Sequence, residues 1–127
     1  MTYTITVQGT RSPDLTPQQF LTHNEEVHIP LLRSLVGDSF PLSHTRHYVK
    51  RSPNPPHAAM VFVGAQEDVP YDMTGTLVFN DEEHFQRYMT RLQEPDAAAK
   101  MAEDAERYMK KGSLRIWAVE EGTVTKE

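Results

Sequence analysis

The alternation of apolar and polar residues predicts strands at both ends of the chain. Near the N-terminus, Tyr3, Ile5 and Val7 alternate with threonines, which is the period-two pattern of a strand. Further strands are predicted at residues 42–51, 72–79 and 114–119. The proline-rich segment 52–56 ends the strand at 42–51, because proline cannot continue a ladder. The short apolar run 58–63 fits either a buried strand or a loop packed over a pocket.

Helix start and stop signals predict three helices between these strands. The first runs over residues 17–35, starts at the hydroxyl cap of Thr16 and ends near Gly37. Pro30 removes one backbone hydrogen bond inside this helix, which predicts a kink there. The second helix follows the acidic segment 80–83, whose charges favour a helix N-terminus, and the third runs from Pro95 to Lys110.

The order strand, helix, strand, strand, helix pair, strand predicts the fold class. It indicates an α+β protein with a ferredoxin-like split βαβ arrangement, in which helices cover one face of an antiparallel sheet. Residues 1–127 show no internal repeat or linker, so we expect a single domain. The other face of the sheet also needs a cover, and a second copy of the chain is the simplest one. We therefore expect a homodimer.

Composition and charge narrow the classes of partner. With 127 residues, 38% hydrophobic and 24% charged, the chain has the composition of a soluble globular domain. The net charge is -5 and no basic cluster stands out, so we expect no nucleic-acid partner. No apolar run approaches the roughly 20 residues that cross a bilayer, and no secretory signal begins the sequence. These features predict a cytoplasmic protein without a membrane partner.

The absence of cysteine leaves histidines and carboxylates as the main candidates for chemistry. Helical projection places His28 beside the apolar stripe of the first helix, which includes Phe20, and therefore toward the core. It places His23 on the opposite flank, so the two histidines are not expected to form a close pair. Their spacing of five residues is also poor for a shared metal ion. No cofactor motif such as a glycine-rich phosphate loop is present, and we expect neither metal nor cofactor.

The strand at 42–51 is polar on both faces. Alternation divides it into two sets of side chains: His44, Arg46 and Tyr48 on one face, and Thr45, His47 and Val49 on the other. Such a strand is either a solvated edge or one wall of a wet pocket beneath the first helix. Alternation alone does not decide which of the two faces points toward the helix. Composition favours packing of Thr45 and Val49 under the helix, which would bring His47 toward His28. Arg46 beside His44 suits anion binding.

Other candidates have simpler structural explanations. The aromatic and methionine side chains of the last helix, Tyr108 among them, are most simply core, although the same residue types line clefts for flat aromatic ligands. His57 lies in the proline-rich loop and His84 lies in the first turn of a helix, and we expect both to be solvated.

Several segments give the chain a resemblance to a known family. These are 23–31 (HNEEVHIPL), Gly37-Asp38, 41–48 (PLSHTRHY), Tyr71-Asp72, Phe79-Asn80-Asp81 and Ala102-Glu103-Asp104 before Tyr108. They resemble the EthD-type family of small dimeric α/β-barrel proteins over nearly the whole chain. The His-Thr-Arg-His-Tyr version is most similar to fungal members that tailor aromatic polyketides, including decarboxylases of atrochrysone carboxylic acid. Ala105 departs from the family pattern, which leads us to expect a second acid there.

The resemblance implies a ferredoxin-like protomer, a dimeric α/β barrel formed sheet to sheet, and a pocket between sheet and helices that works without a cofactor. We accordingly expect a lyase that decarboxylates an aromatic polyketide β-keto acid. His28 would be the general acid and His47 its partner or the proton donor to carbon. His44 or Arg46 would anchor the carboxylate. The remaining substrate contacts are assigned to Tyr48, Phe20 and Tyr108.

Three alternatives fit the same residues. The pocket could catalyse dehydration or cyclisation, or it could support a cofactor-independent monooxygenase, which needs a base and an apolar cavity open to oxygen. A third possibility is a non-catalytic module that carries or shields a hydrophobic intermediate.

Overall fold

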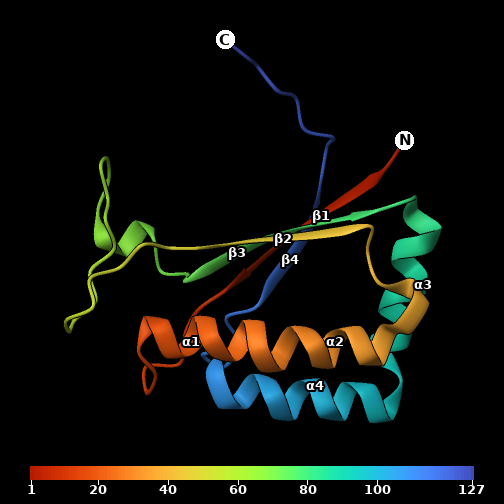
Figure 1. Cartoon of the computed structure of the whole chain (residues 1–127), viewed down its shortest axis with the longest axis horizontal. Coiled ribbons are helices and arrows are strands. Elements are labelled where there is room, and N and C mark those ends of the chain that lie inside the picture. Colours follow the sequence, from red (N-terminus) through yellow and green to blue (C-terminus); the bar gives the residue numbers. More distant parts are fainter.

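The computed structural model describes all 127 residues as one antiparallel sheet with helices on one of its faces (Figure 1). The strands are β1 (Tyr3–Gly9), β2 (Ser43–Tyr48), β3 (Met73–Phe79) and β4 (Arg115–Val119). Their spatial order is β2-β3-β1-β4, and every neighbouring pair is antiparallel. This is the ferredoxin-like order, so the predicted α+β fold class is confirmed.

The helical layer consists of four α-helices and one wider turn. The α-helices are α1 (Pro17–His23), α2 (Ile29–Val36), α3 (Glu82–Gln93) and α4 (Pro95–Tyr108). Thr16 caps α1 as predicted, since its hydroxyl accepts a hydrogen bond from the Gln19 amide and the Gln19 side chain accepts one from Thr16. None of these helices is long and apolar enough to cross a membrane.

The predicted kink near Pro30 takes the form of a π-helical turn over Asn24–His28. The Ile29 amide donates to the carbonyl of Asn24, five residues earlier, and the wider turn ends at His28, two residues before the proline. Proline has no N–H and its ring crowds the preceding turn, which makes such a change of register favourable. The consequence for the site is that side chains five residues apart, rather than four, come to lie one above the other.

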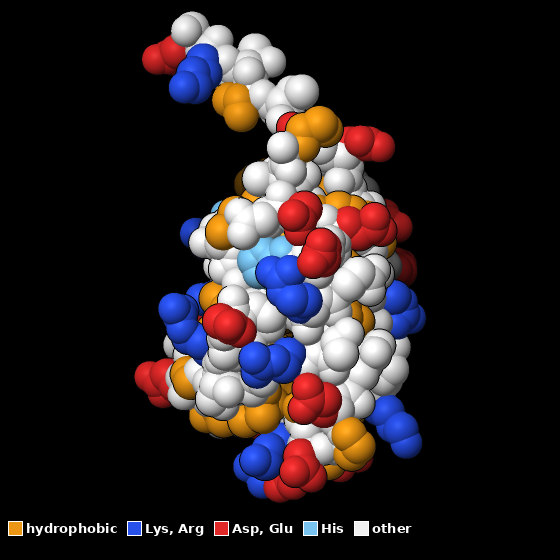
Figure 2. Space-filling view, turned by 90° about the vertical axis from the view of Figure 1, so that its right-hand side faces the viewer, with side chains coloured by type: hydrophobic (Ala, Val, Ile, Leu, Met, Phe, Trp, Pro, Cys, Tyr) orange, Lys and Arg blue, Asp and Glu red, His pale blue; other side chains and the backbone are white.

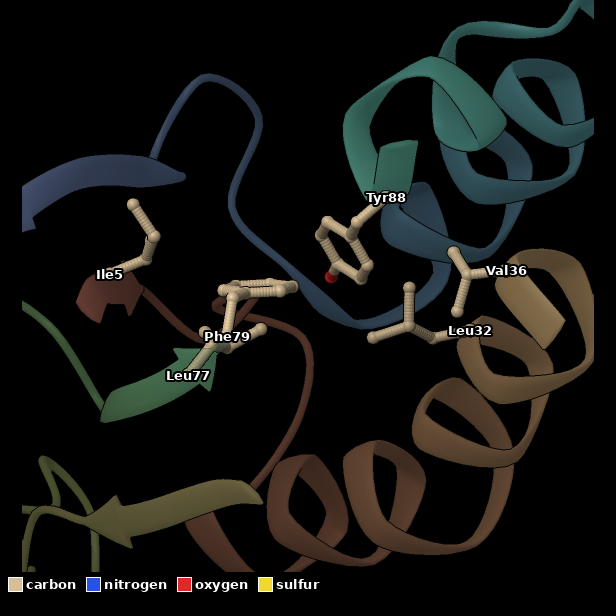
Figure 3. Packing of buried hydrophobic residues seen from close by; sticks show 6 residues of the cluster. All are labelled: Ile5, Leu32, Val36, Leu77, Phe79 and Tyr88. Carbon is tan, nitrogen blue, oxygen red and sulfur yellow. The ribbon is translucent and has the colours of Figure 1, made fainter. Parts of the chain in front are cut away.

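The core lies between the sheet and the helices. Its larger cluster comprises Ile5, Leu32, Val36, Leu77, Phe79 and Tyr88. Figure 3 shows Tyr88 from α3 converging with α2 side chains toward Phe79 of β3, and the two aromatic ring centres are 5.1 Å apart. A smaller cluster of Phe20, Met73 and Tyr108 lies beneath α1 and α4. Each such buried side chain contributes about 1.5–3 kcal/mol, so the two clusters fix the helices on the sheet.

The opposite face of the sheet carries no helix (Figure 1). Threonines of β1 face β4 residues there, with Thr6 opposite Trp117 and Thr4 opposite Val119. Trp117 is 42% exposed and Val119 is 38% exposed in the single chain. Figure 2 shows the C-terminal residues standing away from the body, and positive and negative side chains interspersed on the face in view.

The segment between β2 and β3 forms an arm that extends beyond the end of the sheet (Figure 1). Buried Asp72 anchors its base, since Arg51 Nε lies 2.7 Å and the Arg11 amide nitrogen 2.8 Å from the carboxylate. The apolar run 58–63 is neither a buried strand nor a cover for a pocket. Its side chains at Phe62 and Val63 are 89% and 94% exposed.

Candidate functional site

A cavity lies between the sheet and the helices, with a volume of about 140 Å³. Strands β1, β3 and β4 and helices α3 and α4 supply an apolar lining that includes the methionines Met73, Met89, Met101 and Met109. Besides the tyrosines Tyr88 and Tyr108, three polar residues reach it, namely Asn24, His28 and His44. A cavity of about 150 Å³ holds one benzene ring, so this cavity suits a single small ring.

His28 lies at the end of the π-helical turn and faces the cavity, as its position on the helix predicted. Its Nδ1 lies 2.9 Å from Oδ2 of Asp104, a buried carboxylate on α4. Burial lowers the pKa of His28, although Asp104 acts in the opposite direction. The imidazole is therefore neutral at pH 7. Because a carboxylate can only accept, the single proton is on Nδ1, which leaves Nε2 as a base.

His23 bonds the same carboxylate, with Nε2 2.8 Å from Oδ1 of Asp104. The prediction that His23 and His28 do not form a close pair is therefore wrong. Projection at the α-helical period separates residues five apart, whereas the π-helical turn aligns them. Both rings also lie against Tyr108, at centroid distances of 4.5 Å for His23 and 5.3 Å for His28. No group of three or more His, Asp or Glu side chains is arranged to hold a metal ion.

Asp104 received no role in the sequence analysis, although a signal for it exists. It follows Met101 by three residues and precedes Tyr108 by four, which places an acid on the buried stripe of α4. A buried acid needs partners, and two histidines supply them.

A second polar network ties β2 to the helices. The Tyr48 hydroxyl donates to Glu25 at 2.5 Å and accepts from the Asn24 amide at 2.7 Å. The Tyr108 hydroxyl donates to the other end of Asn24 at 2.8 Å. Burial raises the pKa of Tyr48 to about 12, so its phenol stays protonated at neutral pH. This network gives both the amide nitrogen and the amide oxygen of the Asn24 side chain a hydrogen-bond partner.

Arg46, which was predicted as a possible anchor for a substrate carboxylate, is already paired with a carboxylate of the chain itself. Its guanidinium donates two hydrogen bonds to the carboxylate of Glu25, from Nε at 2.6 Å and from a terminal nitrogen at 2.8 Å. The bond from Arg46 lowers the pKa of Glu25, so that carboxylate stays charged and neutralises the arginine. The cavity lining includes Tyr108 and His44 but not the other predicted substrate contacts, which are Phe20, Arg46 and Tyr48. Phe20 instead packs in the core against Tyr108.

His44 lines the cavity, but its charge state differs from the one that anion binding requires. Burial, followed by the charge of Arg46, lowers the pKa of His44 to about 4. The ring is therefore neutral at pH 7 and offers no positive charge to a carboxylate. Its Nδ1 is buried and has no hydrogen-bond partner.

The orientation predicted for His47 is wrong. His47 pairs with Thr74 on the outer face of the sheet, and its side chain is exposed on the side away from the cavity. The inner face of β2 is instead the one that carries Tyr48 and Arg46, because both bond Glu25 on the π-helical turn. These bonds outweigh the weak preference of Thr45 and Val49 for a buried position. A catalytic partnership between His47 and His28 has no geometric basis in this protomer.

His84 is buried rather than solvated. Its Nδ1 accepts from the Asn80 amide at 3.1 Å, and its Nε2 lies 3.1 Å from the carbonyl oxygens of Ser39 and Phe40. These bonds join the start of α3 to the turn before β2. His84 is a structural residue and does not reach the cavity.

Comparisons with known proteins support the family resemblance. Residues 12–112 match the model of the EthD domain. An EthD family protein from Bacillus halodurans has a similar structure, with a TM-score of 0.58, 17% identity, and coverage of 96% of this chain and 100% of that one. An EthD-like protein from Ralstonia eutropha has a TM-score of 0.56 and 12% identity, with coverage of 91% of this chain and 89% of that one. HapK from Hahella chejuensis has a TM-score of 0.53 and 12% identity, with full coverage of both chains. These identities show a shared fold, and no curated protein sequence matches the chain.

Proposed function

The chain belongs to the EthD domain family, and we propose that it is a cofactor-independent enzyme in which His28 removes a proton from a neutral ring ketone or phenol. The observation that carries this proposal is the bond from His28 Nδ1 to Asp104, which leaves Nε2 unprotonated beside an apolar cavity. A positioned base of this kind typically accelerates a reaction about 100- to 10,000-fold.

The environment of His28 suits a base better than an acid. A general acid must carry its extra proton before substrate arrives, and burial disfavours that charged form. When a neutral His28 takes a proton from substrate, the imidazolium forms next to the carboxylate of Asp104, which offsets its charge. The enolate or phenolate produced at the same moment forms an ion pair with His28 inside the apolar cavity.

The substrate that we propose is an aromatic polyketide or a related ring compound. Such molecules carry enolisable ketones and phenols, and proton removal is the first step of their dehydration, cyclisation or cofactor-independent oxygenation. The cavity of about 140 Å³ takes one ring. Further rings would extend past Leu114, just before the edge strand β4, and Ile116 within it, which line the cavity and are 48% and 47% exposed.

Decarboxylation of a polyketide β-keto acid is the second candidate. The apolar lining favours it, since loss of carbon dioxide disperses a localised carboxylate charge. The reaction also needs a cation to hold the carboxylate and a proton donor for the ketone. Arg46 is neutralised by Glu25 and His44 is uncharged at neutral pH, so a neutral substrate is the better match.

Deuterium exchange into 2-tetralone tests the proposal directly. Proton removal from the ring carbon next to the carbonyl, measured by NMR in deuterium oxide, reports a base without requiring knowledge of the natural product. We expect the protein to accelerate exchange above the buffer rate, and His28→Gln to lose roughly 100-fold. Asp104→Asn should lose a similar factor, because an amide that donates to Nδ1 moves the proton to Nε2. His47→Gln is the matched control and should exchange like the unmodified protein.

Failure of the unmodified protein to accelerate exchange, or equal rates in a folded His28→Gln variant, would overturn the proposal. Two further assays separate the reactions. Oxygen uptake with anthrone would identify a monooxygenase, and carbon dioxide release from 1-tetralone-2-carboxylic acid would identify the decarboxylase. Ring binding without exchange or turnover would identify a binding module.

A further inference from the structure

The imidazole of His44 has no structural explanation within the chain. Its Nδ1 is the one buried side-chain nitrogen or oxygen without a hydrogen-bond partner, whereas buried polar groups in proteins are nearly always paired. The neighbouring polar groups, Asn24 and Tyr48, are bonded to one another and leave His44 out. In a wall this apolar, a leucine or methionine would pack without the penalty that an unpartnered nitrogen carries.

Strand β3 leaves room for this ring. The other inward-facing residues of β3 are large and apolar, namely Met73, Leu77 and Phe79. Gly75 interrupts them, and a β-carbon placed there would lie 3.4 Å from Nε2 of His44. Glycine in the middle of a strand weakens it and commonly marks a close approach by another group. Here the group is the His44 ring, which lies over Gly75 at the wall of the cavity.

The charges around His44 restrict what it can bind. The groups that act on it are Arg46, Glu25 and His28, and Arg46 and Glu25 neutralise each other through two bonds. His28 is neutral for the reasons given above. An aromatic carboxylate in the cavity would meet no free cation, whereas a hydroxyl can donate to a bare ring nitrogen and a carbonyl can accept from a ring N–H.

We propose that His44 binds, through Nε2, the oxygen of a neutral phenol or ring ketone, so that the cavity selects an oxygen-bearing ring over a hydrocarbon ring of the same size and over an aromatic carboxylate. The inference rests on the proposed function, because it names the ligand class of the same cavity. His44 holds the oxygen end of the ring, and His28 meets the same ring from the helical side.

Binding of three single-ring probes tests this without turnover. Phenol, toluene and benzoate are titrated by calorimetry or ligand-observed NMR into the unmodified protein, His44→Phe and His47→Phe. We expect the preference for phenol over toluene to fall at least 10-fold in His44→Phe, since the hydrogen bond is lost and toluene still fills the cavity. His47 is on the same strand with its side chain on the other face, so the His47→Phe variant should keep the preference for phenol. Benzoate should bind more weakly than phenol.

A second variant separates the hydrogen bond from the fold. Gly75→Ala places a β-carbon in van der Waals contact with the ring of His44 and keeps both ring nitrogens, so it should keep the preference for phenol over toluene. An unchanged phenol preference in a His44→Phe variant that still binds toluene would overturn the inference, as would tight binding of benzoate. The two failures are distinguishable. Absent deuterium exchange with an intact, His44-dependent phenol preference would refute only the proposed reaction.

Discussion

At the scale of single residues, Asp104 determines the chemistry that His28 can perform. Its two oxygens bond one histidine each, so the same carboxylate orients both rings and fixes the proton of His28 on Nδ1. Position along the helix was enough to predict that His28 faces the core. It was not enough to identify the partner, because Asp104 is 76 residues away in the chain and only the packing of α4 on the π-helical turn brings them together.

The lowered pKa of His44 makes a prediction about stability. The folded protein holds its pKa at about 4, below the usual value near 6.5, so between these pH values the unfolded chain binds more protons. The contribution of the neutral His44 ring to the free energy of unfolding is therefore present above pH 6.5 and is lost as the pH falls toward 4. Since part of the ring is open to solvent, which screens its charge, we expect a loss of about 2 kcal/mol.

Denaturant unfolding of the unmodified protein and of His44→Phe at pH 7 and pH 4 measures this loss. Groups that do not interact with His44 titrate equally in both proteins, so the difference between them reports His44 together with its coupling to Glu25 and His28. The unmodified protein should lose more stability on acidification than His44→Phe does, while His47→Phe should follow the unmodified protein. Parallel profiles for all three proteins would contradict the prediction.

At the scale of elements, the sequence contained the break in the first helix but not its form. Pro30 predicted a kink, because a residue without an N–H must disturb the preceding turn. Whether the helix bends or forms a π-helical turn depends on where the freed carbonyls find hydrogen-bond partners. The pattern of apolar residues does not predict which of the two occurs. The inner face of strand β2 was predicted wrongly for a related reason. Its polar residues face inward because Glu25 of the π-helical turn bonds Arg46 and Tyr48.

Replacing the proline tests the role of the π-helical turn. Pro30→Ala supplies the missing N–H and raises helix propensity, which favours the ordinary α-helical register. We expect unchanged or higher thermal stability together with about 10-fold slower deuterium exchange into 2-tetralone, since His23 and His28 would no longer align on Asp104. Leu31→Ala, next in the chain and outside the cavity lining, is the control. Exchange at the normal rate in Pro30→Ala would show that the alignment does not need the proline.

At the scale of the whole molecule, the order of elements was sufficient to predict the fold, because each sheet and helix signal was local and the connections left one simple topology. Assembly is a separate question. The sheet has helices on one face only, and its other face exposes Trp117 and Val119 among threonines (Figure 1). A half-covered sheet with an exposed tryptophan is typical of a surface that is buried by a partner. We therefore retain the prediction of a homodimer that forms through this face.

Trp117→Glu tests the dimer at the surface that would form it. A homodimer should elute and scatter light at twice the chain mass of 14.5 kDa, and its melting temperature should fall on dilution, because dissociation precedes or accompanies unfolding. A buried glutamate opposite its symmetry mate would place two like charges in the interface, so Trp117→Glu should be monomeric at micromolar concentration. Val124→Glu, on the exposed C-terminal residues, is the control and should remain dimeric. A monomeric unmodified protein with a concentration-independent melting temperature would refute the dimer, and a dimeric Trp117→Glu would move the interface to another surface.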